Sequence, residues 1–404
     1  MEQNRSTAGG YRWGLLGAAF VIMMVISIYQ YSWFLFAYSL QKQFNWTLPA
    51  IGLTFTIFTY AATFIQPFSG YIADSYGPRK VALAASFLVG TGLLLASTAE
   101  STTLLYVYYG LGGIGVGILY GISAACAIKW FPDRRGFATG LVVFGFGAGT
   151  AIFNWFIQRL LETNGLQTTF VYLGIGMLLV LIPLSFFYRY PPRKAQTKKS
   201  SNTPAAPESD YRPVEMLKTH QWYLIYFSFT FTISIVLMFG AQMKTMAREF
   251  DLPKTYFNLL LVLFPLGNGL SRVFAGAISD KIGREKTMVI FYFLLGLSIF
   301  CFVLFADIPA LFVLIVFVAS LLGGAPFALY PATIGDYYGT AYSTTNYGIT
   351  YTAKSFAGLI SGWLSGYLVM KFGSFTPALL FIGACSLAAA VVSLPRIMKP
   401  PVRR

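Results

Sequence analysis

Charged residues are scarce in this chain of 404 residues: they make up 11% of it, whereas hydrophobic residues make up 56%. A soluble domain carries about 25% charged residues, so the scarcity excludes a soluble globular protein. The apolar runs are about 20 residues long, the length of an α-helix that crosses a bilayer, and not the alternating segments of about 10 residues found in membrane β-barrels. We expect an all-α integral membrane protein.

Histidine and buried acid are also in short supply. None of the 14 Asp and Glu falls well inside an apolar run, and the single histidine, His220, precedes the seventh run. A membrane-embedded enzyme would need metal ligands or a nucleophile with its base, so we expect no enzyme, no metal site and no cofactor. A carrier of cations or sugars is disfavoured as well, because no buried acid would hold the cation. The three cysteines lie inside apolar runs and predict no disulfide framework.

Twelve apolar runs are predicted to be membrane-spanning helices. They form two sets of six, separated by a stretch rich in Pro, Ser and Lys, residues 190–213, which is typical of a flexible linker. We predict an N-terminal six-helix half at 1–188, a linker at 189–221 and a C-terminal six-helix half at 222–404. The predicted runs are residues 13–40, 48–73, 81–99, 104–128, 137–158, 168–188, 222–243, 255–279, 287–306, 308–335, 345–370 and 376–394.

The basic residues are unevenly distributed between the two sides of the predicted membrane. Of the 29 Lys and Arg, two lie inside runs and six in the loops of one side, which leaves 21 on the side of the termini and the linker. Because basic loops stay in the cytoplasm, we predict cytoplasmic termini. The net charge of +15 is therefore a sign of topology, and no nucleic-acid partner is expected.

One short basic sequence occurs twice. GYIADSYGPRK begins at Gly70 and GAISDKIGREK begins 206 residues later, at Gly276. Each copy is predicted to form the tight turn between the second and third helix of its half, so the chain is an internal duplication, as many transporters are. An ion pair at these helix ends would form in one access state and break in the other. We therefore expect a gating role for Asp74, Arg79, Asp280 and Arg284.

The repeated turn resembles the signature loop of the major facilitator superfamily, Gly-x-x-x-Asp-x-x-Gly-Arg-Arg/Lys. The second copy matches at Gly276, Asp280, Gly283, Arg284 and Lys286. The first copy departs from the pattern at Pro78. The resemblance extends over the whole chain in the number of helices and in the two halves, and it implies alternating access, with the halves rocking around a central site.

Two cations stand inside the apolar runs without an acidic partner: Arg272 in the eighth run and Lys354 in the eleventh. A cation in the bilayer costs several kcal/mol unless it faces a cavity or a partner. Either side chain could instead extend toward the membrane surface or pair with backbone carbonyls, but their similar depth on different helices favours a shared cavity. The pattern predicts a site for an anionic ligand.

Polar and aromatic residues surround these cations in the predicted helices. Asn268 precedes Arg272 by four residues and Tyr351 precedes Lys354 by three, so each pair shares a helix face. A single aromatic residue is more often a packing residue, but a tyrosine hydroxyl inside the membrane needs a partner, which a small carboxylate would supply. The predicted substrate-binding residues are Gln30, Tyr31, Tyr120, Asn268, Arg272, Phe327, Tyr330, Tyr351 and Lys354.

The sequence around the cations is similar to the bacterial oxalate–formate exchangers and the related monocarboxylate transporters. NGLSR, which ends at Arg272, matches the eighth-helix arginine of both, and TAK, which ends at Lys354, matches the eleventh-helix lysine of the oxalate exchangers. The resemblance implies that Arg272 binds the substrate carboxylate and that the protein lies in the bacterial cytoplasmic (inner) membrane. Asn268 stands where the animal monocarboxylate transporters carry Asp, which leaves the route of a coupled proton open.

The expected function is secondary active transport of small carboxylate anions. The sequence favours proton-coupled symport of a monocarboxylate such as lactate, and exchange of oxalate for formate stays open as the alternative. Two cations suit a dianion, which favours exchange, whereas Tyr351 replaces the tryptophan expected at an oxalate site, which weakens that fit. The expected partners are the substrate, protons and the lipid bilayer, and we expect a monomer.

Overall fold

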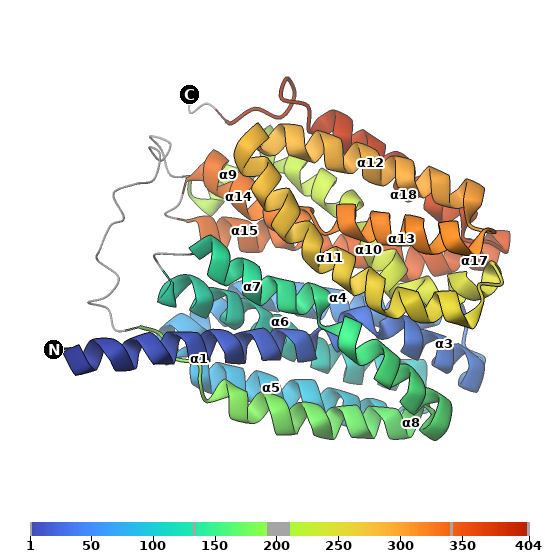
Figure 1. Cartoon of the computed structure of the whole chain (residues 1–404), viewed down its shortest axis with the longest axis horizontal. Helices are drawn as coiled ribbons and strands as arrows, with labels where there is room; N and C mark the ends of the chain where they lie inside the picture. The colour runs from blue at the N-terminus through green and yellow to red at the C-terminus, as the bar shows by residue number, and fades with distance from the viewer. Residues whose placement is uncertain (1, 132–134, 192–210, 340–341, 402–404) are drawn as a thin grey trace.

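The computed structural model describes residues 2–131, 135–191, 211–339 and 342–401, and these ranges fold into helices without a strand. The helices of the N-terminal part, blue to green in Figure 1, pack as one group beneath those of the C-terminal part, yellow to red. The predicted all-α fold with two halves is therefore confirmed.

The N-terminal half consists of α1 (Glu2–Ile26), α2 (Ile28–Tyr31), α3 (Trp33–Phe44), α4 (Leu48–Tyr76), α5 (Pro78–Ala96), α6 (Thr102–Trp130), α7 (Arg135–Ala148) and α8 (Thr150–Ser185). The C-terminal half consists of α9 (Pro213–Leu217), α10 (His220–Glu249), α11 (Lys254–Ile282), α12 (Arg284–Phe305), α13 (Pro309–Gly323), α14 (Pro326–Tyr338), α15 (Ser343–Tyr351), α16 (Ala353–Leu359), the π-helical η2 (Ile360–Leu364), α17 (Ser365–Phe372) and α18 (Thr376–Val392).

Nine helical stretches of the described residues are long and apolar enough to cross a membrane. One of them, Gly140–Ser185, has 46 residues and bends in α8 at Gly165, where φ is 77°, so it supplies two crossings. Two more crossings are shorter or divided: α18 has 17 residues, and the segment before it is split among α15, α16, η2 and α17. With these, the described chain contains the twelve crossings that the sequence predicts.

The repeated turns have the same backbone geometry. Gly77 has φ 87° and ψ 147°, and Gly283 has φ 95° and ψ 157°. L-residues with a side chain rarely adopt such positive φ values, so glycine is needed to join two helices in so short a turn. Both turns lie on the side of the molecule that holds the termini, at the left of Figure 1, here called the termini side. The end with Gly165 and the α10–α11 turn is called the opposite side.

Part of the predicted linker, residues 189–221, is docked on the C-terminal half, while residues 192–210 lie outside the described ranges. The backbone N–H of Tyr211 donates to the carbonyl of Tyr338 at 2.9 Å, and the side chain of Asn346 donates to the Tyr211 carbonyl at 3.1 Å. The stretch that leads into α10 is therefore structured against α14 and α15.

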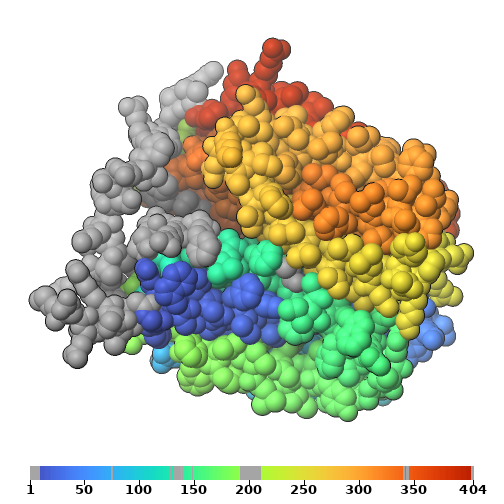
Figure 2. All heavy atoms as spheres, in the orientation of Figure 1, coloured from blue at the N-terminus to red at the C-terminus, as the bar shows by residue number. Residues whose placement is uncertain are grey.

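The two halves approach each other closely where α4 passes η2 and α17. A Cβ atom on either Gly52 or Gly362 would collide with backbone atoms of the other residue. One turn further, a Cβ on Gly366 would lie 2.9 Å from the carbonyl oxygen of Leu48. No side chain separates these helices, which brings the halves together toward the opposite side. Figure 2 shows a further contact on the visible face, between α8 in green and the start of α11 in yellow.

Candidate functional site

A small distortion of the first crossing lies beside polar groups in the middle of the molecule. Ser27 and Ser32 flank the four-residue α2, but both keep right-handed helical backbone angles, and their N–H groups still donate to the carbonyls four residues earlier at 3.2 Å and 3.0 Å. Gln30 and Tyr31, both on α2, are fully buried. The first crossing is therefore a nearly continuous helix that carries two polar side chains into the protein interior, where such groups need a partner.

Arg272 is held by groups from both halves and is 5% exposed. Its Nη1 donates to the backbone carbonyl of Val143 on α7 at 2.7 Å, and its Nη2 donates to Asn268 Oδ1 at 3.1 Å and to the Tyr31 hydroxyl at 3.4 Å. That hydroxyl also donates to Asn268 Oδ1 at 2.9 Å. The guanidinium carbon lies 4.7 Å from the ring centre of Phe327, so hydrogen bonds and an aromatic face stabilise the cation.

Lys354 is 3% exposed, and its surroundings are aromatic. Its Nζ lies 3.5 Å from the Tyr351 hydroxyl and 5.7 Å from the ring centre of Phe146. Tyr120 stacks on Tyr351 with 5.9 Å between ring centres. Phe146 lies between Tyr120 and Tyr31, at 5.1 Å and 5.7 Å from their rings. A continuous set of rings therefore connects the surroundings of Lys354 with those of Arg272.

The buried charges of the described residues at this centre are positive. Arg272 and Lys354 are the buried charged side chains of the described residues, and no buried Asp or Glu accompanies them there. The two positive charges are near enough to repel each other. Buried charges are strongly unfavourable unless they are paired, so the centre is suited to an anion.

Several polar atoms at the centre have no hydrogen-bond partner among the described residues. They are both amide atoms of Gln30, Nδ2 of Asn268 and Nε of Arg272, all buried. An unpaired buried donor or acceptor costs about 1–3 kcal/mol. These atoms belong to the same group of residues as the buried cation, which indicates that a polar ligand or water completes the site.

Tyr330 is the predicted site residue that the structure places elsewhere. Its ring packs on Phe229 at 4.6 Å and on Tyr292 at 6.2 Å, both residues of the C-terminal half. Phe327 lies three residues earlier on α14 and takes the place beside Arg272. The remaining predicted binding residues lie around Arg272 or Lys354.

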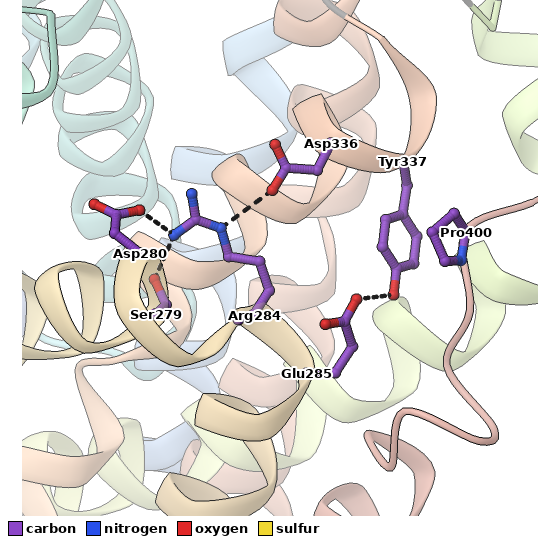
Figure 3. Close-up of a pocket in the computed structure, with 8 residues that line it drawn as sticks. Ser279, Asp280, Arg284, Glu285, Asp336, Tyr337 and Pro400 are labelled. Carbon is purple, nitrogen blue, oxygen red and sulfur yellow. Dashed lines mark hydrogen bonds and ion pairs between the residues drawn. The ribbon is translucent and has the colours of Figure 1, made fainter. Parts of the chain in front are cut away.

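The predicted gating residues of the second repeat lie together on the termini side (Figure 3). Arg284 Nη1 pairs with Asp280 Oδ1 at 2.6 Å, and Arg284 Nε pairs with Asp336 Oδ2 on α14 at 3.1 Å. All three residues belong to the C-terminal half, so these pairs do not bridge the halves. In the first repeat, Arg79 is exposed, and the side chain of Asp74 lies outside the described part of the structure.

An ion pair between the halves does occur on the opposite side, at residues that the sequence analysis does not single out. Lys254 Nζ on α11 lies 3.2 Å from Glu162 Oε1 on α8. Gln158 Nε2 donates both to that oxygen at 3.1 Å and to Asn258 Oδ1 at 3.2 Å. Lys254 and Glu162 belong to no recognisable motif. The packing of α8 on α11 brings the two residues together.

A family model described as the Major Facilitator Superfamily matches residues 15–243 and 223–404 of this chain. The D-xylose–proton symporter has a similar structure, with a TM-score of 0.75 at 18% identity, covering 95% of this chain and 97% of that one. At such low identity the likeness concerns the fold.

Two curated relatives are similar in sequence. The oxalate:formate antiporter of Oxalobacter formigenes is 33% identical over 398 residues, which is 97% of this chain and 93% of the relative. Monocarboxylate transporter 12 of Xenopus laevis is 23% identical over 420 aligned residues, which is 97% of this chain and 91% of the relative.

Proposed function

Because the chain belongs to the major facilitator superfamily, and within it to the oxalate–formate and monocarboxylate group, we propose that it carries small carboxylate anions across the membrane by alternating access. The observation that supports this substrate class most directly is the pair of buried cations, Arg272 and Lys354, with no buried acid among the described residues. An anion entering the centre would neutralise charge that the protein leaves uncompensated.

Arg272 is proposed as the main anchor. A guanidinium binds a carboxylate through two parallel hydrogen bonds, which a lysine ammonium cannot reproduce. In the structure, two of the positions around the guanidinium are taken by the Val143 carbonyl and the Tyr31 hydroxyl, both from the N-terminal half. A substrate carboxylate would replace these neutral acceptors with a charged one, so binding would change the contact between the halves.

Exchange is favoured over symport by the charge of the empty centre. Two like charges that repel each other have to be buried whenever an empty carrier closes and returns, whereas a carrier loaded with an anion returns neutralised. Proton-coupled symport of a monocarboxylate such as lactate is the second candidate. It is favoured by Lys354, a buried titratable group whose Nζ lies 3.5 Å from the Tyr351 hydroxyl and has no buried acid beside it among the described residues.

Purified protein in liposomes distinguishes these proposals. Uptake of labelled oxalate or formate that requires unlabelled anion inside the liposomes supports exchange. Uptake of labelled lactate that is driven by an inward proton gradient, with no carboxylate inside, supports symport. If none of the three anions is transported under either condition, the carboxylate proposal is wrong.

The membrane arrangement is proposed on the same basis. We propose that residues 1–188 and 222–404 are the moving halves, that the termini side faces the cytoplasm, and that the protein acts as a monomer in the bacterial inner membrane. The Lys and Arg distribution supports this orientation. A reporter fused to the C-terminus that is active only in the cytoplasm tests it.

A further inference from the structure

A proline in α11 leaves one backbone carbonyl without its helical partner. Pro265 stands inside this helix. Proline has no N–H, so the carbonyl of the residue four positions earlier, Leu261, cannot make its usual hydrogen bond. A free carbonyl in the protein interior is costly unless another donor reaches it.

Asn154 of the other half supplies that donor. It lies on α8, is 0% exposed, and its Nδ2 donates to the Leu261 carbonyl at 3.2 Å. Its Oδ1 accepts from the hydroxyl of Ser32 at 2.6 Å. Ser32 is the residue that follows α2 in the first crossing. One buried amide therefore connects the first crossing, α8 and the proline of α11.

These contacts lie directly beside the substrate-binding groups along the chain. Ser32 follows Tyr31, and Asn268 and Arg272 lie about one and two turns beyond Pro265 on α11. Tyr31, Asn268 and Arg272 are themselves joined by hydrogen bonds. The amide of Asn154 thus bridges the same two helices one layer nearer the opposite side.

We propose that Asn154 is a positioning residue for the carboxylate anchor: by pairing with the carbonyl freed by Pro265, it holds the backbone of α11 at this point, and with it Arg272, in place while the halves are closed on the opposite side. This inference rests on the proposed function in naming the anchor. When the halves separate on that side, Asn154 moves away from α11 and water can solvate the Leu261 carbonyl. The hydrogen bond therefore favours the closed arrangement.

The double substitution of Asn154 and Pro265 tests this role. Asn154→Ala is expected to lower carboxylate affinity and to shift the halves toward opening on the opposite side, each by roughly tenfold, the cost of one orphaned buried carbonyl. Pro265→Ala restores an N–H for Leu261, so Asn154→Ala in that background is expected to change both quantities by no more than about twofold. Thr150→Val, one turn away on α8 and equally buried, is the matched control and is expected to change neither.

Opening is measured without substrate, from the distance between spin labels at the exposed positions Thr163 and Thr255. An Asn154→Ala protein with wild-type distances and affinity overturns the inference. The inference is also overturned if Asn154→Ala has an equally large effect in the wild-type and the Pro265→Ala backgrounds, because the freed Leu261 carbonyl would then not be the cause of the effect. Spin-label distances that follow the expected pattern in a protein that transports no carboxylate would leave the conformational role standing and reject the proposed function alone.

Discussion

The two halves share a backbone plan but differ in charge at the centre. The repeat offset of 206 residues places Gln66 of the N-terminal half opposite Arg272 of the C-terminal half. Gln66 Nε2 donates to the carbonyl of Ala62 on its own helix at 3.3 Å, whereas Arg272 reaches Val143 in the other half. The two halves share the helices and turns, while the proposed recognition groups are divided: the cations belong to the C-terminal half and the neutral acceptors Val143 and Tyr31 to the N-terminal half.

The same contrast holds in the repeated turns. Gly77 and Gly283 adopt matching positive φ values, but Pro78 stands at the position of Arg284. Proline begins α5 without a side-chain donor, so the double ion pair that Arg284 makes with Asp280 and Asp336 cannot form through this residue. The turn geometry is common to both halves, and the ionic contact is a property of the second.

The largest effect is expected from a substitution of Arg272, the charged residue that corresponds to the neutral Gln66 of the other half. Arg272→Lys keeps the charge but removes the planar pair of donors, and we expect carboxylate affinity to fall roughly 100-fold. Gln66→Ala, at the equivalent position of the other half, is expected to leave affinity unchanged. Calorimetric binding to the detergent-solubilised protein measures both. Wild-type binding by Arg272→Lys would show that the anchor lies elsewhere.

Lys354→Gln should have a smaller and selective effect. If Lys354 meets a second carboxylate, the substitution weakens dicarboxylate binding roughly tenfold, the value of one charge-assisted contact, and spares monocarboxylates. If it holds the coupled proton, transport becomes independent of the proton gradient instead. Uptake of oxalate and lactate at several external pH values separates these results, and equal affinity with equal pH dependence excludes both roles.

A third test concerns the turns and is expected to affect rate more than recognition. Asp280→Asn removes one of the two acids that hold Arg284, and because the pair is partly exposed we expect the transport rate to fall no more than about fivefold. Substrate affinity should stay within a few fold. Asp74→Asn in the first repeat is the comparison, and we predict the same direction of change. Loss of binding in step with uptake would mean that the turn supports the fold rather than the motion.

The smallest effect is expected from the ion pair between the halves on the opposite side. Glu162 and Lys254 are 44% and 68% exposed, so their attraction is largely screened. Glu162→Gln should change the ratio of the two access states by about twofold, and high salt should have the same effect on the wild type. Spin-label distances measured at low and high salt test this prediction. If Glu162→Gln changed the ratio of the access states more than Asn154→Ala does, the ranking of the two effects would be wrong.

Much of this molecule could be predicted from its sequence because membrane helices and buried charges leave a strong signal. The twelve crossings, the duplication and the proximity of Asn268 to Arg272 follow from apolar length and helical spacing. The contact between Arg272 and the Val143 carbonyl could not, since a backbone acceptor has no sequence signature. Phe327 and Tyr330 show a second limit of prediction from sequence. They lie three residues apart on α14 but have different neighbours, and only the packing orientation of α14 determines that Phe327 contacts Arg272.

The close approach of α4 to the eleventh crossing has a practical consequence. At Gly52 and Gly362 there is no space even for a methyl group, so the smallest side chain available would act as a wedge between the halves. Exchanging either glycine for alanine offers a way to trap the carrier open on the opposite side. A protein arrested in this way is expected to expose the buried surroundings of Arg272 and Lys354 to inhibitors added from that side, which the close contact of the two helices otherwise excludes.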